Sequence, residues 1–445
     1  MIPSETSHAP VTTHARVQTA WVWYDWANSV FPLTITTAVF PVFYQEATQA
    51  NGYAEIPFFG LSLANTALWS YTLSAAFLVI AFLSPLLSGI ADYTGKKRAF
   101  MHAFCALGAL ASISLVGFDG SNPYWGLSGL FFGMIGFAGS IVFYNGFLPE
   151  IATPEQQDHL SARGFSMGYI GSVLLLILNL AIIQKPTWFG LPPDEASIPV
   201  YISFVSVGIW WYGFAQIPLR VLPDNVYQRK HSGHPWSGGF RALQSVAGEL
   251  RGQPLLTGFL LAFLFQSMGV QTVMYVATLF GKKVLGLETG QLIVTVLVIQ
   301  LVAIAGAYGF AALSKRLGNL KALMLAVAVW VGICVGAYGV YSASGFYVLA
   351  GVVGSVMGGV QSLSRSTYAK FLPPTQSHAS YFSFFEFTEK IAIVLGTFSY
   401  GLIEDLTGSM RNSVLALLAY FVLALLLMLW LLNVQRRYGR PTAVS

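Results

Sequence analysis

The chain reads Gly89-Ile90-Ala91-Asp92-Tyr93-Thr94-Gly95-Lys96-Lys97-Arg98 where one long apolar segment gives way to the next. Gly89 permits close contact between helices, and Gly95 permits a tight turn. Asp92 can accept hydrogen bonds from a neighbouring helix end or pair with a cation, while the basic triplet can anchor the loop at an anionic membrane surface. An ordinary basic loop is the competing interpretation, but the order of glycine, acid, glycine and basic cluster is more specific than such a loop requires.

The apolar character on both sides of this stretch is typical of the whole chain. Of 445 residues, 55% are hydrophobic and only 9% are charged, whereas a soluble domain has roughly 25% charged residues. The chain cannot cover itself with a water-facing surface, so we expect an integral membrane protein. The net charge of +5 lies in short clusters between apolar runs, which favours membrane orientation over nucleic-acid binding. Cys105 and Cys334 lie inside apolar stretches and indicate neither a disulfide framework nor a metal site.

Twelve segments each have close to the ~20 residues needed to cross the hydrocarbon of a bilayer. We place them at residues 17–45, 62–91, 97–117, 123–150, 161–184, 198–221, 254–281, 289–313, 320–341, 345–370, 379–404 and 412–434. The longest polar stretch predicts an N-terminal six-helix bundle (1–221), a cytoplasmic linker (222–253) and a C-terminal six-helix bundle (254–445). This all-α layout of two pseudo-symmetric bundles is that of transporters whose halves rock around a central site.

The distribution of basic residues predicts the orientation of the chain. If the N-terminus is cytoplasmic, the inside segments hold Lys96, Lys97, Arg98, Arg229, Lys230, Arg241, Arg251, Lys315, Arg316, Lys321, Arg436, Arg437 and Arg440. The outside loops hold only Lys185, Lys282, Lys283 and Arg411. This is the positive-inside pattern, so we expect both termini to be cytoplasmic, in a bacterial inner (plasma) membrane.

Four residues of the first segment follow helical spacing and share one face: Trp21, Tyr24, Asp25 and Asn28. Pro32 cannot donate to the carbonyl of Asn28, which predicts a kink and leaves that carbonyl available to a partner. An ionisable residue inside a membrane is costly and suggests function. Two interpretations stay open for Asp25: part of a cavity wall or gate, or a structural bond to a neighbouring helix.

The eleventh segment carries a second cluster of charges. Glu386 and Lys390 have the favoured i,i+4 spacing, and Glu389 lies on an adjacent face. Two acids against one cation leave an excess carboxylate that could carry a proton; a neutralised structural triad is the alternative. Arg365 of the tenth segment could pair with one of these acids or bind a substrate carboxylate, and a gate pair is an equal alternative. Gln271 is a candidate pocket residue, although such an amide more often bonds a neighbouring helix.

The stretch from Gly89 to Arg98 looks like the loop between helices two and three of the major facilitator superfamily. Four further motifs are similar to the vacuole-effluxer-like branch of that superfamily: Tyr24-Asp25-Trp26-Ala27-Asn28-Ser29, Phe143-Tyr144-Asn145-Gly146-Phe147-Leu148-Pro149-Glu150, Gly168-Tyr169-Ile170-Gly171 and Gly359-Val360-Gln361-Ser362-Leu363-Ser364-Arg365-Ser366. That branch comprises the fungal autophagy-related vacuolar amino-acid effluxers and their bacterial relatives. The resemblance spans about Trp21 to Leu432.

The resemblance implies a major facilitator fold, transport by alternating access and a small polar solute, with an amino acid favoured because the fungal members export them. It also implies that Gly89, Asp92, Gly95, Lys96, Lys97 and Arg98 form a cytoplasmic gate. Two positions depart from the family: Asn145 stands where relatives often have Asp, and Met268 where Asp or Asn is common.

The second half contains a partial echo of the gate motif, from Ala312 to Lys321. Aligning Gly318 with Gly95 places Lys315 opposite Asp92, so the acid is missing. We therefore expect a latch on this side to work differently or to be weaker.

The remaining motifs exclude most chemistry. The sequence has no His-Glu-x-x-His motif, no Cys/His metal spacing and no phosphate-cradling loop with its lysine, so we expect neither an enzyme nor a cofactor. A secondary transporter, driven by an ion or solute gradient and acting as a monomer, is the prediction; its expected partners are a small-molecule solute, protons and the lipid bilayer, without nucleic acid. The alternative is a receptor or lipid-interacting protein on the same fold, which would show no saturable flux.

Overall fold

The computed structural model describes residues 14–192, 195, 197–227 and 234–438. The N-terminal half consists of the segments up to α8: α1 (Ala15–Asn28), the π-helix η1 (Phe31–Ala38), α2 (Phe40–Ala50), α3 (Asn65–Thr94), α4 (Lys97–Ser114), α5 (Pro123–Asn145), α6 (Leu148–Ile151), α7 (Pro154–Gln184) and α8 (Ser197–Val221). Short 3-10 turns follow α4 and α7, at η2 (Leu115–Gly117) and η3 (Pro186–Phe189).

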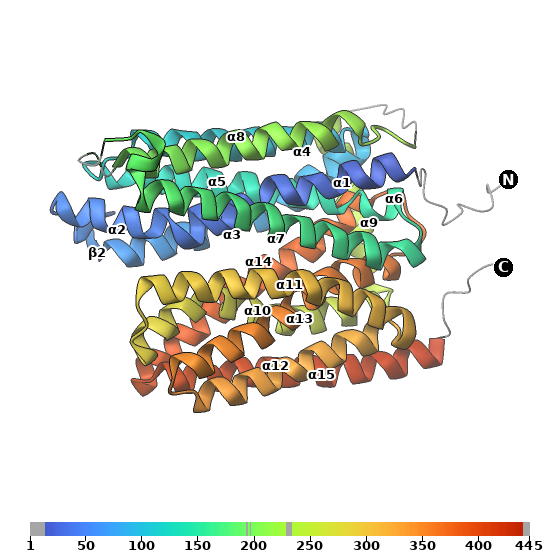
Figure 1. Ribbon diagram of the computed structural model, residues 1–445. Helices are drawn as coiled ribbons and strands as arrows, with labels where there is room; N and C mark the ends of the chain where they lie inside the picture. The colour runs from blue at the N-terminus through green and yellow to red at the C-terminus, as the bar shows by residue number, and fades with distance from the viewer. Residues whose placement is uncertain (1–13, 193–194, 196, 228–233, 439–445) are drawn as a thin grey trace.

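The C-terminal half consists of six long helices: α10 (Pro254–Leu285), α11 (Thr289–Leu317), α12 (Asn319–Gly339), α13 (Ala343–Phe371), α14 (His378–Thr407) and α15 (Met410–Tyr438). One more helix, α9 (Pro235–Arg251), lies in the polar connection between the halves. Figure 1 shows the two halves stacked, the N-terminal half in blue to green and the C-terminal half in yellow to red. α1 begins and α15 ends at the same end of the molecule, which we call the terminal end (Figure 1).

The helix ends follow from local sequence. Prolines occupy the first turn of α5, α7, α9 and α10, where a missing N–H costs nothing. Gly95, Gly286 and Gly408 end their helices in the left-handed conformation that favours glycine. The described residues include eleven helical segments long and apolar enough to cross a membrane. The twelfth helix of comparable length is α14, whose Glu386, Glu389 and Lys390 lower its hydropathy.

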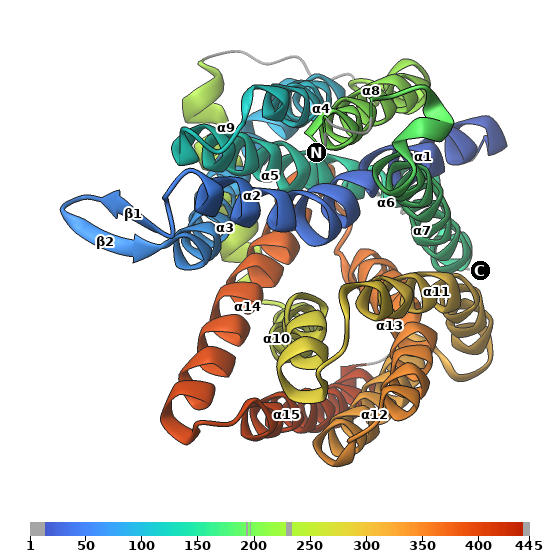
Figure 2. The same ribbon diagram turned by 60° about the vertical axis from the view of Figure 1, so that its left-hand side comes forward.

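The twelve predicted segments correspond to the observed helices, although several of their ends differ by a few residues. The fifth begins at Pro154 and not at residue 161, because Thr153 and Gln156 form a capping box. The second begins at Asn65, because residues 61–64 form a strand. Strands β1 (Glu55–Phe58) and β2 (Leu61–Ala64) pair as an antiparallel hairpin, which was not predicted and which projects from the molecule beside α3 (Figure 2).

The interruption predicted at Pro32 is present. Helix α1 ends at Asn28, and η1 begins at Phe31 with Pro32 in its first turn. The hydroxyls of Thr36 and Thr37 donate to the carbonyl of Pro32, and the wider turn places the N–H of Val39 on the carbonyl of Thr34. Such π-helical segments are frequent at functional sites.

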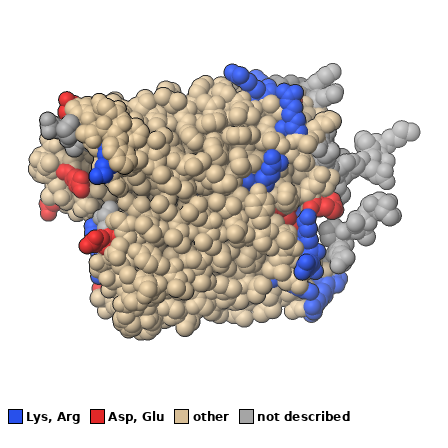
Figure 3. Space-filling model, in the orientation of Figure 1, with Lys and Arg blue, Asp and Glu red and all other residues tan. Residues whose placement is uncertain are grey.

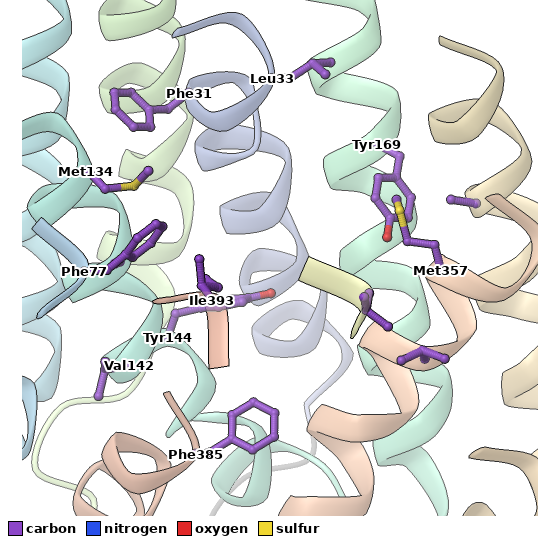
Figure 4. Packing of buried hydrophobic residues seen from close by; sticks show 14 of the residues in the cluster. Phe31, Leu33, Phe77, Met134, Val142, Tyr144, Tyr169, Met357, Phe385 and Ile393 are labelled. Atoms are coloured by element: carbon purple, nitrogen blue, oxygen red, sulfur yellow. The ribbon is translucent and has the colours of Figure 1, made fainter. Parts of the chain in front are cut away.

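One apolar cluster runs through both halves. Figure 4 shows part of it, with Tyr144 and Tyr169 from the N-terminal half and Met357 and Phe385 from the C-terminal half. On the face drawn in Figure 3, exposed charged side chains lie toward the two ends: most Lys and Arg are at the terminal end, and acidic side chains with fewer cations are at the opposite end.

Candidate functional site

A buried polar network lies between the two halves. It contains five ionisable side chains from three helices, Asp25 of α1, Arg365 of α13, and Glu386, Glu389 and Lys390 of α14. Two amides, Asn145 at the end of α5 and Gln271 of α10, connect these groups. Seven of the nine predicted substrate or proton candidates are therefore brought together.

The centre of the network is the pair between Arg365 and Asp25. Both terminal nitrogens of the guanidinium lie 3.3 Å from Oδ2 of Asp25, and the two residues are 3% and 5% exposed. Arg365 also donates to the hydroxyl and to the carbonyl of Ser161, each at 2.9 Å. The hydroxyl of Tyr144 donates to the same Asp25 oxygen at 2.7 Å. The hypothesis that Arg365 pairs with an acid of the eleventh segment is wrong. Arg365 pairs with Asp25, and both acids of the eleventh segment, Glu386 and Glu389, form ion pairs with Lys390.

Aromatic rings enclose the guanidinium of Arg365. Its central carbon lies 4.2 Å from the ring centre of Phe165 and 4.8 Å from that of Trp21, distances at which cation–π attraction is favourable. Gly164 makes the approach possible, because a Cβ there would collide with the Asp25 carboxylate and Arg365. Gly164 and Ser161 were not among the predicted residues, because their roles depend on a helix pairing that spacing along one chain does not reveal.

The charges of α14 form the second part of the network. The ammonium of Lys390 lies 2.8 Å from Glu386 and 2.6 Å from Glu389, so the predicted i,i+4 contact is present. Gln271 donates to the other oxygen of Glu389 at 2.8 Å. The network holds three carboxylates and two cations, and therefore carries one excess negative charge when every group is ionised.

Asn145 joins the two parts. Its amide nitrogen donates to Glu386 at 2.7 Å, and its carbonyl accepts from Arg365 at 3.3 Å. An ionised Asp could not donate to Glu386. At this position, where the sequence departs from the pattern it resembles, the amide can therefore donate to a carboxylate and accept from a guanidinium at once.

Tyr24 and Asn28 lie outside this network. The ring of Tyr24 packs 5.0 Å from that of Tyr144, inside the N-terminal half. Its hydroxyl and the amide nitrogen of Asn28 are buried without a hydrogen-bond partner among the described residues. The helix face predicted for Trp21, Tyr24, Asp25 and Asn28 is therefore divided. Asp25 belongs to the network and Trp21 lies against the Arg365 guanidinium, whereas Tyr24 and Asn28 belong to the packing around it.

The network lies between the terminal end and the middle of the helices. At 1.5 Å per residue, Asp25 is about 15 Å from the start of α1 and Glu386 about 12 Å from the start of α14. Helices of 30 residues, such as α3 and α14, are about 45 Å long.

The predicted gate motif joins the end of α3 to the beginning of α14. Oδ2 of Asp92 accepts hydrogen bonds from the backbone N–H and the hydroxyl of Ser380, both at 2.7 Å. A carboxylate at a helix N-terminus is favoured by the unpaired N–H groups and the helix dipole. Gly95 turns the chain with a φ of 70°.

The basic residues of the motif have separate partners. Lys97 forms a buried ion pair with Glu150, which also lies 3.1 Å from Nδ1 of His378 at the start of α14. Arg98 pairs with Asp224 of the connection at 3.2 Å. Lys96 is exposed, and Gly89 lies against the backbone of Gly239 in α9.

A second latch joins α7 to the C-terminal half through Asp158. This carboxylate lies 2.7 Å from the Ser314 hydroxyl, 2.7 Å from the Asn319 amide and 2.7 Å from the Lys370 ammonium. The motif of the C-terminal half has Lys315 where the first motif has Asp92, and the acid of this latch comes from the N-terminal half. The second latch therefore differs from the first, as predicted. Sequence comparison of the two motifs could not find Asp158, because it lies on neither motif.

The hydrogen bonds between the halves are confined to one side. Among the described residues, the hydrogen bonds between the halves all lie between the terminal end and the middle of the helices. They involve Asp25, Asp92, Asn145, Glu150, Asp158, Ser161, Ser166 and Tyr169 of the N-terminal half. None among these residues joins the halves nearer the opposite end. The structure is therefore closed at the terminal end.

Other chemistry finds little support in these residues. Gly164-Phe165-Ser166-Met167-Gly168 has the spacing of a nucleophile elbow, but it lies within α7, and Ser166 donates to the carbonyl of Ile304. An elbow requires a strand-to-helix turn. Among the described residues, no group of three His, Cys, Asp or Glu side chains is placed to hold a metal ion.

Comparisons with known proteins extend over nearly the whole chain. Residues 13–440 match the family model described as vacuole effluxer Atg22 like. An uncharacterized MFS-type transporter, YxiO of Bacillus subtilis, is 32% identical over 414 residues, covering 92% of this chain and 94% of that protein. Autophagy-related protein 22 of Eremothecium gossypii is 26% identical, covering 94% of this chain and 90% of that protein.

The fold is also that of solved transporters. The major facilitator superfamily transporter FucP in its outward conformation superposes with a TM-score of 0.65, covering 94% of this chain and 98% of FucP at 15% identity.

Proposed function

The chain belongs to the vacuole effluxer Atg22-like family of the major facilitator superfamily and is a membrane transporter. We propose that it exports a small polar solute and that this export is coupled to protons. The observation that carries the proposal is the excess carboxylate of the network that joins the two halves. We propose a bacterial inner membrane, a cytoplasmic terminal end and a monomer as the working form.

The proposed solute class is an amino acid or a similar metabolite that carries both charges. Arg365 offers a guanidinium to a carboxylate, and Asp25, Glu386 and Glu389 offer carboxylates to an ammonium. Trp21, Tyr144 and Phe165 provide apolar walls beside these groups. A zwitterion can replace the partners that Arg365 and the acids lose when the halves separate.

The need for a proton follows from the same separation. Opening the terminal end breaks the Asp25–Arg365 pair and the Asn145–Glu386 bond, because each joins the two halves. A buried charge left without its partner costs several kcal/mol. Protonation of Asp25 removes that cost for its carboxylate. Glu386 keeps its pair with Lys390 and loses only the Asn145 donor, so its protonation would relieve a smaller cost. Opening is therefore expected to take up a proton.

The depth of the network supports export. When the terminal end opens, a cytoplasmic solute has about 12–15 Å to travel to Asp25 and Glu386, less than half the length of a 30-residue helix. When the Asp92 and Asp158 latches close again, the solute can leave only through the opposite end of the molecule.

The test is efflux of a metabolite library from proteoliposomes, with and without an imposed pH gradient. Wild-type efflux is expected to saturate with solute concentration and to become roughly ten-fold faster with the gradient. A factor of ten corresponds to a barrier that protonation lowers by about 1.4 kcal/mol. Asp25→Asn and Glu386→Gln are expected to lose this acceleration. Glu404→Gln is the control, because it removes a carboxylate of the same helix that pairs with Lys283, outside the network.

The outcomes separate the parts of the proposal. Efflux that ignores the gradient and is unchanged in Asp25→Asn and Glu386→Gln would remove the coupling but not the transport. No saturable flux of any solute would instead favour a receptor or lipid-interacting role.

A further inference from the structure

Helix α9 has two faces of different character. Its buried face contains Gly238, Gly239, Val246 and Leu250. Its opposite face is exposed and contains Trp236, Phe240, Arg241, Gln244 and Arg251, which share that side by helical spacing. Trp236 is 55% exposed and Phe240 is 51% exposed. Two large aromatic side chains beside two cations are unusual on a face that meets only water.

The position of α9 places this exposed face toward the bilayer. Gly239 packs backbone to backbone on Gly89 and Ile90 of α3, and Gly238 packs on Tyr93. Phe82 lies seven residues before Gly89 and hence on the same face of α3, where it is 69% exposed. α9 therefore covers the lipid-facing side of α3, and its own outer face continues that side.

The position of α9 along α3 corresponds to the depth of the lipid headgroups. Gly89 is five residues before the end of α3 at Thr94, or about 8 Å from it. α3 is about 45 Å long, which equals a bilayer with its headgroup layers. The aromatic side chains of α9 can then reach the acyl boundary while the cations meet the phosphates, as in other interfacial helices.

The charges on α9 are available for an anion. The ion pairs of the described residues include neither Arg241 nor Arg251. Arg241 uses its Nε to donate to the carbonyl of Ser237, and its terminal nitrogens form no ion pair with the acids that the structure describes. Glu249, the acid of α9, lies on the other side and accepts from Tyr381 of α14 at 2.6 Å.

We propose that the outer face of α9, formed by Trp236, Phe240, Arg241, Gln244 and Arg251, binds anionic phospholipids of the leaflet at the terminal end. The phosphates lie at Arg241 and Arg251, and the acyl chains lie against Trp236 and Phe240. Because α9 contacts α3 through Gly239 and α14 through Glu249, the lipid is bound by the element that connects both sides of the Asp92 latch. Lipid binding at this face does not depend on which solute is carried.

The test places a polarity-sensitive fluorophore at Gln244→Cys in the full chain, since both native cysteines are buried. The labelled protein is reconstituted in neutral phosphatidylcholine, in the same lipid with one phosphatidylglycerol in three, and in neutral lipid with soluble inorganic phosphate. Quenching of the label by acrylamide, which is uncharged and is not repelled by an anionic surface, is expected to fall about two-fold with phosphatidylglycerol and to stay unchanged with free phosphate.

Two variants and one control make the outcome decisive. Arg241→Gln/Arg251→Gln is expected to abolish the effect of phosphatidylglycerol, and Trp236→Ser/Phe240→Ser to raise quenching in every lipid. Lys315→Gln/Arg316→Gln removes two exposed cations from α11 at the same end and is expected to keep the effect. Equal quenching in neutral and anionic lipid, or equal loss in the α11 control, would overturn the proposal. Protection by free phosphate alone would show an anion site without lipid binding, and would overturn it too.

Discussion

At the scale of single residues, Arg365 determines how the halves meet, because it donates to Asp25, Asn145 and Ser161 of the other half at once. Its partner could not be predicted, since 340 positions separate it from Asp25. The contact of Lys390 with Glu386 was predictable, because four positions on one helix bring two side chains together whatever surrounds them.

A double-mutant cycle tests the Asp25–Arg365 pair. Asp25→Asn and Arg365→Gln should each lower the melting temperature by several degrees, since each leaves a buried charge without its partner at a cost of about 3 kcal/mol. The double variant should melt above either single variant, because both charges are gone. Thermal unfolding of the purified protein measures this, and simple addition of the two losses would show that the residues are not coupled.

At the scale of elements, the two latches use the same chemistry with the acid on opposite halves. Asp92 lies in the last turn of α3 and accepts hydrogen bonds from the start of α14, whereas Asp158 lies near the start of α7 and contacts Ser314, Asn319 and Lys370. Each motif predicted a turn and a basic loop from its glycine and cations. Neither contained the partner across the interface, because that partner depends on which helix ends face each other.

Exchange of charges tests the second latch. Asp158→Lys should loosen the terminal end by placing two cations together, and Lys370→Asp should do so by placing two acids together. The combined variant should recover most of the loss, since the ion pair is restored in reverse. The measurement is the rate at which a thiol reagent modifies a cysteine introduced at Ser362, a buried position at the interface. A combined variant as open as either single one would contradict the latch.

At the scale of the whole molecule, transport requires the closed terminal end to open. Ser161 of α7 donates to the carbonyl of Ser362 in α13 at 2.8 Å, which joins the two halves near Arg365. A short bifunctional thiol reagent across Ser161→Cys/Ser362→Cys should hold this end closed and abolish flux. A cleavable reagent should allow recovery after reduction.

The control for this experiment joins two positions within one half. Ser206→Cys with Asn179→Cys crosslinks α7 to α8, whose side chains are 3.0 Å apart. Flux should survive there, because the N-terminal half is expected to move as one body. Undiminished flux through the chain locked at Ser161 and Ser362 would exclude alternating access at this interface.

The amino-acid sequence by itself determined the membrane class, the helical segments, the break at Pro32 and the residues of the charged clusters. These follow from hydropathy, from the geometry of proline and from spacing along one helix, all of which are local. The tertiary structure decided the pairing of Asp25 with Arg365, the role of Asn145, the acid of the second latch and the place of α9. Each of these depends on how helices distant in sequence rotate and pack against one another, and packing sets that rotation only once the whole chain has folded.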